Sequence, residues 1–268
     1  MLWFGKIGLS EKEVFLMAYY NNQNGGPPGM LPNSQYPPVW ANEEEYKQAT
    51  SQCLIRVFLR MFAALVVTAF AAFAVASSDA LVSLVFGNPA VYIVLIIVEL
   101  ILVIAISAGI KRMSATAANV LFFVYAAING VTLAVIFLVY DLGIIYHAFA
   151  VSALMFGGIA LFGAITHWDL SKVGSICIMG LFGIIIASIA NIFFRSSALE
   201  SAVLYIGVLV FVGLTAYDTQ RIKRMLREAN GVSHVEAIKR ISVIGALTLY
   251  LDFINMFLRI LRILGRRR

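Results

Sequence analysis

The chain has 268 residues, of which 61% are hydrophobic and 13% are charged, and its formal net charge is +6. A typical soluble domain is about 45–50% apolar and about 25% charged. A chain of this composition has too little polar surface to enclose its apolar residues in water, which excludes a soluble enzyme and an extracellular disulfide scaffold. The positive charge does not indicate a nucleic-acid partner, because the basic residues stand in short runs beside apolar segments, as in membrane-protein loops.

Residues 1–53 differ in composition from the rest of the chain. They hold five of the six prolines, a glycine pair and the acidic run that begins at Glu43. Such a segment buries too little apolar surface to fold alone, so we predict a disordered, Pro/Gly-rich cytoplasmic tail. It lacks the charged and apolar regions of a cleaved signal peptide. We expect residues 54–268 to form the membrane domain.

Apolar stretches long enough to cross a bilayer recur throughout that domain. A helix needs about 20 residues to cross roughly 30 Å of hydrocarbon. Seven stretches qualify, and none contains an interior proline: 54–77, 89–110, 116–140, 144–166, 173–194, 200–218 and 241–264. The sequence therefore predicts an all-α membrane protein with seven transmembrane helices, whose partner is the lipid bilayer.

The distribution of lysine and arginine predicts the orientation. Basic residues gather in the connections at 111–112 and 219–240, whereas 78–88 and 141–143 contain none. Because cytoplasmic loops carry the excess of positive charge, we place the N-terminus in the cytoplasm and, after seven crossings, the C-terminus outside. The arginine-rich C-terminal end opposes this bias. Either the last helix crosses against it or the segment is re-entrant, and we predict crossing.

Three acidic residues fall within or at the end of apolar spans: Glu99, Asp218 and Asp252. Ionisable groups inside a membrane are costly, face the bundle interior and mark a pathway or relay. Glu99 has no basic residue within one helical turn, so we expect it to be protonated. A hydrogen-bonding role in packing and a functional role both remain open for it.

The surroundings of the two aspartates also predict polar contacts. Asp218 and Arg221 share a helix face and can form an ion pair. The alternative to a functional role is that Asp218 is an interfacial carboxylate that Arg221 neutralises. Asp252 belongs to a polar stripe along an otherwise apolar helix, which places it in a bundle interior or along a water-filled path. Helix packing is the alternative use of that stripe, whose members are Gly245, Thr248, Asp252, Asn255, Arg259 and Arg262.

Two segments carry a family resemblance. FVGLTAYDTQRIK, from Phe211 to Lys223, and GALTLYLDFIN, from Gly245 to Asn255, resemble the Bax inhibitor-1 family, and most of all its bacterial inner-membrane members. The resemblance covers residues from about 45 to 268. It implies a seven-helix bundle with the last helix at its centre.

The same resemblance implies a function. It indicates a pH-sensitive calcium leak in which Asp218 and Asp252 form a proton-sharing dyad. From the polar patterns described above, we expect Asn255, Arg221 and Glu99 to be accessory polar groups. A basic residue at the end of the second helix latches the dyad in the family, and the register leaves Lys111 and Arg112 equally open for that role. No cofactor is implied.

Elementary electrostatics supports this expectation. Two close carboxylates cannot both ionise cheaply, so they share a proton and titrate as a pair. Loss of that proton adds repulsion between the two helices and creates a site for Ca²⁺, a hard cation that prefers oxygen ligands. We therefore expect Asp218 and Asp252 to be the ion and proton site.

Other functions compete with the leak. An intramembrane aspartyl protease would use such a dyad to activate water, but no Gly-x-Gly precedes Asp252, and we expect no enzyme. A proton-coupled carrier and a regulator of other membrane proteins remain alternatives. We expect the two cysteines, Cys53 and Cys177, to serve as small apolar side chains. Neither the cysteines nor the histidines have metal-ligand spacing; the histidines are His147, His167 and His234.

Overall fold

The protein is represented by a computed structural model that describes residues 43–110, 113–229 and 233–266. Within these ranges the chain forms helices and short connections and contains no strand. Seven candidate spans are long and apolar enough to cross a membrane, which confirms the predicted fold class. They are α2 (Glu43–Ala76), α4 (Pro89–Gly109), α5 (Ala115–Leu133) with α6 (Val135–Val139), α7 (Leu142–Ile165), α8 (Ser171–Phe194), α9 (Ser197–Arg227) and α10 (His234–Gly265).

The first helix begins earlier than predicted. Residues 43–53, which we expected to belong to the disordered tail, are the start of α2. Contacts with α9 hold this extension: the Tyr46 hydroxyl donates to the Lys223 carbonyl at 3.0 Å, and Arg227 pairs with Glu43 at 2.7 Å. Composition alone does not reveal such distant partners. The remainder of the predicted tail, residues 1–42, lies outside the described residues.

Two further differences concern the connections. The predicted loop at 78–88 contains the short helix α3 (Asp79–Phe86). The predicted span 116–140 divides at Ala134 into α5 and α6. There the Ala134 amide bonds to the carbonyl of Val131, three residues back rather than four, which tightens the helix by a 3₁₀-type turn.

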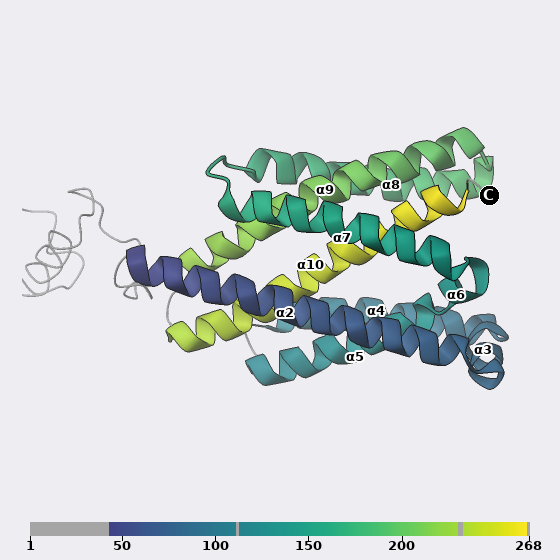
Figure 1. The fold of residues 1–268 in the computed structure, drawn as a ribbon, viewed down its shortest axis with the longest axis horizontal. Helices are drawn as coiled ribbons and strands as arrows, with labels where there is room; N and C mark the ends of the chain where they lie inside the picture. The colour runs from purple at the N-terminus through teal and green to yellow at the C-terminus, as the bar shows by residue number, and fades with distance from the viewer. Residues whose placement is uncertain (1–42, 111–112, 230–232, 267–268) are drawn as a thin grey trace, which may run out of the picture.

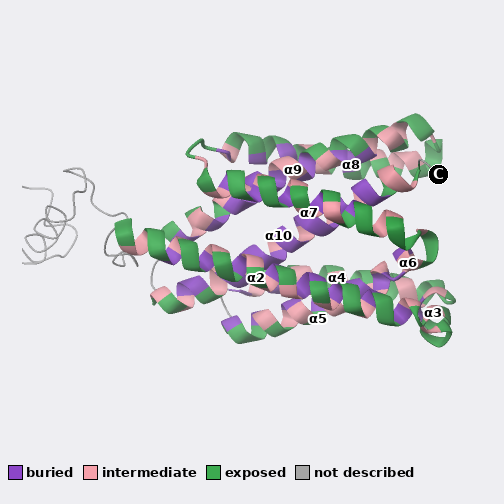
Figure 2. Cartoon of the chain, viewed as in Figure 1, coloured by how far each residue is buried: buried purple, intermediate pink, exposed green. Residues whose placement is uncertain are grey.

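The last helix lies at the centre of the bundle. α10 packs against α2, α5, α7 and α9, and it runs diagonally between the α2–α5 side and the α7–α9 side (Figure 1). Buried residues concentrate on α10, whereas the outer helices present exposed residues along much of their length (Figure 2). Leu154 and Phe193 are 78% and 79% exposed, as expected of side chains that face lipid. Polar groups on the inward side of α10, such as Ser242 and Asp252, are therefore sheltered from both lipid and water.

α10 is continuous from His234 to Gly265 and ends at the opposite end of the bundle from the start of α2 (Figure 1). This agrees with a crossing last helix and not with a re-entrant one. The sidedness of the two ends stays a prediction.

Candidate functional site

Asp218 and Asp252 lie together in the bundle core, on the neighbouring helices α9 and α10. They are 7% and 4% exposed, and the charge of Asp218 acts on Asp252. Asp218 Oδ1 and Asp252 Oδ2 are buried without a hydrogen-bond partner among the described residues. Buried polar atoms are nearly always satisfied in native proteins. A shared proton, a water molecule or a cation would satisfy these two oxygens.

The hydroxyl groups beside Asp218 do not serve it. Thr215 and Thr219 are fully buried. Their hydroxyls donate instead to the helix carbonyls of Phe211 and Thr215, each at 2.8 Å. This local bonding is common for threonine in helices, and it leaves the Asp218 carboxyl group dependent on neighbours from other turns and helices.

Arg221 is the basic residue nearest to this pair in the described structure. Its Nη1 lies 3.7 Å from Asp218 Oδ1, which confirms the predicted ion pair. The separation exceeds hydrogen-bond distance. The Arg221 side chain is 52% exposed, so water weakens the attraction. Arg221 therefore supplies a nearby positive charge without fully neutralising the buried carboxyl groups.

A third helix, α8, packs against α9 near the pair and contributes Cys177. The carboxyl group of Asp252 acts electrostatically on the buried Cys177 thiol. A Cβ atom at Gly213 of α9 would overlap the Cys177 sulfur, so this glycine permits the close approach of α8. We had interpreted Cys177 only as a small apolar residue. No local sequence signal marks its contact with Gly213, because this contact depends on helix packing.

The described residues contain no group of three or more His, Cys, Asp or Glu side chains placed to hold a metal ion. The aspartate pair alone therefore offers two carboxylates, far fewer protein ligands than a high-affinity Ca²⁺ site uses. Such a pair fits a transient cation better than a resident one.

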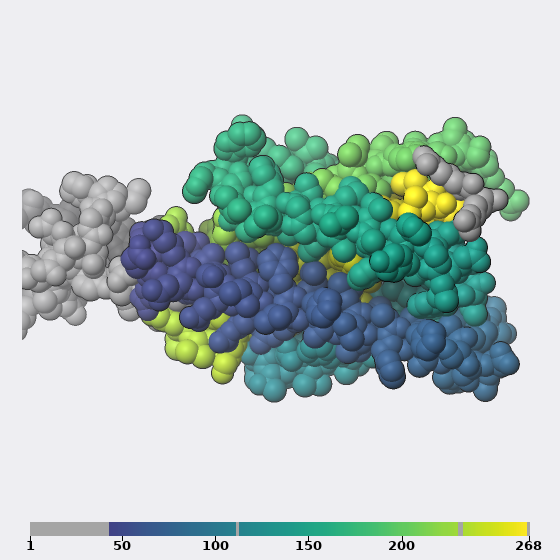
Figure 3. Space-filling view, in the orientation of Figure 1, coloured from purple at the N-terminus to yellow at the C-terminus, as the bar shows by residue number. Residues whose placement is uncertain are grey.

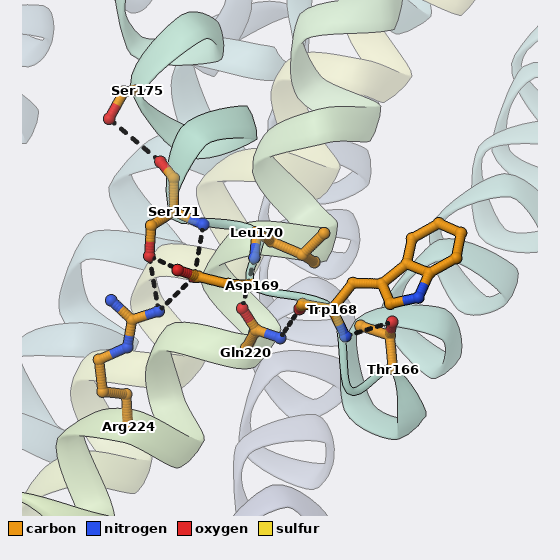
Figure 4. A network of polar contacts seen from close by, with 8 residues as sticks. All are labelled: Thr166, Trp168, Asp169, Leu170, Ser171, Ser175, Gln220 and Arg224. Carbon is orange, nitrogen blue, oxygen red and sulfur yellow. Dashed lines mark hydrogen bonds and ion pairs between the residues drawn. The ribbon is translucent and has the colours of Figure 1, made fainter.

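A polar network anchors the C-terminal end of α9, the end that we predict to face the cytoplasm. Gln220 donates to the Trp168 carbonyl at 2.7 Å and accepts from the Leu170 amide at 2.9 Å (Figure 4). Arg224 donates to Asp169 at 3.3 Å and to Ser171 at 2.8 Å. These contacts tie the connection between α7 and α8 to α9, within two turns of Asp218.

Asp169 is the acidic member of this network. Hydrogen bonds from the Ser171 side chain and amide lower the pKa of Asp169, and Arg224 adds to the effect. The carboxylate is therefore held in its charged form.

Glu99 does not join the aspartate pair in its hydrogen bonding. Its oxygens accept hydrogen bonds from Asn129 at 3.0 Å and Thr132 at 2.6 Å, both on α5. The Tyr250 hydroxyl of α10 donates to Asn129 Oδ1 at 2.9 Å and lies 2.7 Å from the Thr68 hydroxyl of α2. Sequence reasoning missed this network, because Tyr250, Asn129 and Thr68 carry no charge.

Asn255, the other predicted accessory residue, bonds within its own helix. Asn255 donates to the Leu251 carbonyl at 2.9 Å and lines a cavity toward the C-terminal end of α10. Lys111 and Arg112, the two candidates for a latch, lie outside the described residues. Their role stays a prediction.

Comparison with known proteins decides the family. The family described as "Inhibitor of apoptosis-promoting Bax1" matches residues 50–268. The chain belongs to the Bax inhibitor-1 family. It is 46% identical over 215 residues to the inner membrane protein YbhL of Escherichia coli, covering 80% of this chain and 92% of that protein.

Other bacterial relatives extend the same match. An uncharacterized protein of Borreliella burgdorferi is 41% identical over 215 residues, covering 80% of this chain and 92% of the relative. One of Rickettsia prowazekii is 36% identical over 228 residues, covering 85% and 95%. The family resemblance predicted from the two aspartate segments is thereby confirmed, and this Bax inhibitor-1 family member is an integral membrane protein.

Proposed function

We propose that this protein is a pH-sensitive leak path for Ca²⁺, gated by the Asp218–Asp252 pair and without enzymatic activity. One observation carries the proposal: two carboxyl groups are buried on packed neighbouring helices in the core of a membrane bundle, each with a buried oxygen that lacks a hydrogen-bond partner among the described residues. Buried ionisable groups of this kind are typical of ion and proton pathways.

The location of the pair links its protonation to the packing of the central helix. Asp252 lies on the central helix and Asp218 on a helix packed against it. When the pair holds a proton, repulsion between the carboxyl groups is relieved. When the proton leaves, repulsion favours separation of α9 and α10 and the oxygens become available to a divalent cation. Proton occupancy would thereby control the packing of the central helix.

The location proposed for the protein is a bacterial inner membrane, with the N-terminus in the cytoplasm and the C-terminus outside. The chain's similarity to an inner membrane protein of Escherichia coli supports this membrane. The basic residues Lys223, Arg224 and Arg227 lie on the end of α9 that contacts the start of α2. The positive-inside rule supports placing this end in the cytoplasm.

Calcium flux into liposomes tests the proposal. The full chain would be reconstituted with a Ca²⁺-sensitive dye inside, and flux measured from pH 5 to pH 8. Replacing both aspartates with asparagine (D218N and D252N together) should abolish the pH dependence. Asp79→Asn is the matched control, because Asp79 is exposed and distant in sequence. An unchanged pH profile in the double variant would overturn the role of the pair.

The same liposomes separate the alternatives. A leak gives passive flux that follows the Ca²⁺ gradient, whereas a carrier gives saturable counterflux of a second solute. A protease would cleave a transmembrane substrate and lose that activity in Asp218→Ala. If the protein regulates other membrane proteins through residues 1–42, deletion of these residues should abolish binding of the partner protein and leave Ca²⁺ flux unchanged.

A further inference from the structure

A second polar feature lies away from the aspartate pair, between α8, α9 and α10. It is a cavity of about 280 Å³ whose polar lining includes Asn191, Glu200, Asn255, Arg259 and Arg262. Since one water molecule occupies about 30 Å³ of liquid, the cavity has room for a small anion with part of its hydration shell. It lies toward the C-terminal end of α10, which reaches the surface between α7 and α9 in Figure 3.

Arg259 is held firmly at the wall of this cavity. Its Nη1 donates to the Val203 carbonyl at 3.1 Å, and its guanidinium lies over the Phe211 ring at 5.2 Å from the centroid. Gly207 leaves the space that the guanidinium occupies, because a Cβ atom there would overlap it. The buried Nε has no hydrogen-bond partner among the described residues. The backbone and ring contacts thus orient this cation without neutralising it.

Arg262 adds a second unneutralised cation. The structure gives its side chain no hydrogen bond or ion pair with any described residue, and its charge acts unfavourably on Arg259. The acidic residue of the lining, Glu200, is already paired with Arg266. Two guanidinium groups that repel each other therefore line one polar cavity without a carboxylate of their own. An anion would relieve that repulsion.

We propose that this cavity binds a phosphate-type anion through Arg259 and Arg262, supplied either as free phosphate or as a phospholipid headgroup. Guanidinium groups match the geometry of phosphate oxygens and form charge-assisted hydrogen bonds with them. The Asn255 amide borders the same space. The site does not depend on the calcium leak, and it binds its anion whether or not the aspartate pair conducts ions.

Thermal unfolding of the full chain in an uncharged detergent tests the proposal. One arm titrates inorganic phosphate against chloride at constant ionic strength. The other arm titrates a short-chain phosphatidylglycerol against a diacylglycerol of the same chain length. In wild type, phosphate, phosphatidylglycerol or both should raise Tm saturably. Arg262→Gln, at an exposed position, should weaken the apparent affinity about tenfold or more.

Two further variants make the result decisive. Arg259→Gln should also weaken the ligand-induced rise in Tm, measured against the Tm of the same variant without ligand. If Arg259→Gln does not fold, Arg262→Gln alone carries the test. Arg56→Gln is the matched control, because Arg56 is an exposed arginine in the first half of α2. A shift with phosphate identifies the free anion, and a shift with lipid alone identifies the headgroup. The absence of a saturable shift in both arms, or a shift that survives Arg262→Gln, would overturn the proposal.

Discussion

Gly163 of α7 lies directly against the backbone of Ala216 on α9. A Cβ atom at position 163 would stand 3.0 Å from the Ala216 Cα and would overlap the Ala216 carbonyl oxygen. This contact is two residues before Asp218. Small residues let transmembrane helices approach closely where hydrophobicity does not drive association. The absent side chain of Gly163 thereby helps to set the position of the aspartate-bearing helix.

The substitution Gly163→Ala should therefore destabilise the bundle. The added methyl group meets backbone atoms that cannot rotate away, so we expect a loss of about 1–3 kcal/mol. Gly158→Ala is a matched control on the same helix, because its Cβ meets no atom within 4 Å. That variant should be neutral or gain up to about 1 kcal/mol from helix propensity. Thermal unfolding in detergent compares the two, and equal stability would contradict the close contact.

Tyr250→Phe should weaken the attachment of the central helix to α2 and α5. The change removes the hydroxyl that bonds Asn129 and Thr68. Interhelical hydrogen bonds in membranes contribute about 1 kcal/mol each, so Tm should fall measurably. Tyr125→Phe is the control: Tyr125 packs edge-to-face on Tyr250, but the structure gives its hydroxyl no described partner. An equal loss in both variants would show that ring packing, and not hydrogen bonding, matters.

Arg221→Gln should move the pH profile of Ca²⁺ flux to higher pH. Removing a positive charge 3.7 Å from Asp218 makes ionisation of that carboxyl group less favourable. Because Arg221 is half exposed, the shift should be smaller than about one pH unit. Arg221→Lys keeps the charge and should retain most of the wild-type profile. A midpoint shift to lower pH in Arg221→Gln would contradict this account.

The connection between α7 and α8 should stay attached to α9 when the pH falls from 7 to 5. Hydrogen bonds from Ser171 lower the pKa of Asp169, so its anchoring contribution is present above the ordinary carboxyl pKa of about 3.9. That contribution is lost as the pH falls through the lowered folded value. Hydrogen exchange of residues 167–171, corrected for intrinsic rates, should therefore show constant protection from pH 7 to pH 5.

Asp169→Asn checks the sign of that effect. It should reduce protection already at pH 7, because the charged acceptor for Ser171 and Arg224 is gone. Asp79→Asn should leave this protection unchanged. Full protection in Asp169→Asn would mean that the two Gln220 bonds hold the connection without the carboxylate.

Much of the fold could be predicted from local pattern. Span length and apolar composition identify transmembrane helices because crossing hydrocarbon imposes a strict length. The scarcity of charge in those spans singled out Glu99, Asp218 and Asp252, and the family resemblance selected the two aspartates among them. The start of α2 at Glu43 was not predictable in this way, because partners on α9 stabilise it.

Composition and hydropathy along the chain thus determined by themselves that the protein resides in a membrane, which segments span it and which acidic residues fall within those spans. Only the tertiary structure decided which side chains share a site. It packed Cys177 of α8 against Gly213 of α9, separated Glu99 into its own network and set Arg259 and Arg262 in one cavity with residues of α8 and α9. The reason is physical: hydrophobicity and helix period act along the chain, whereas helix rotation and crossing bring distant polar groups into contact.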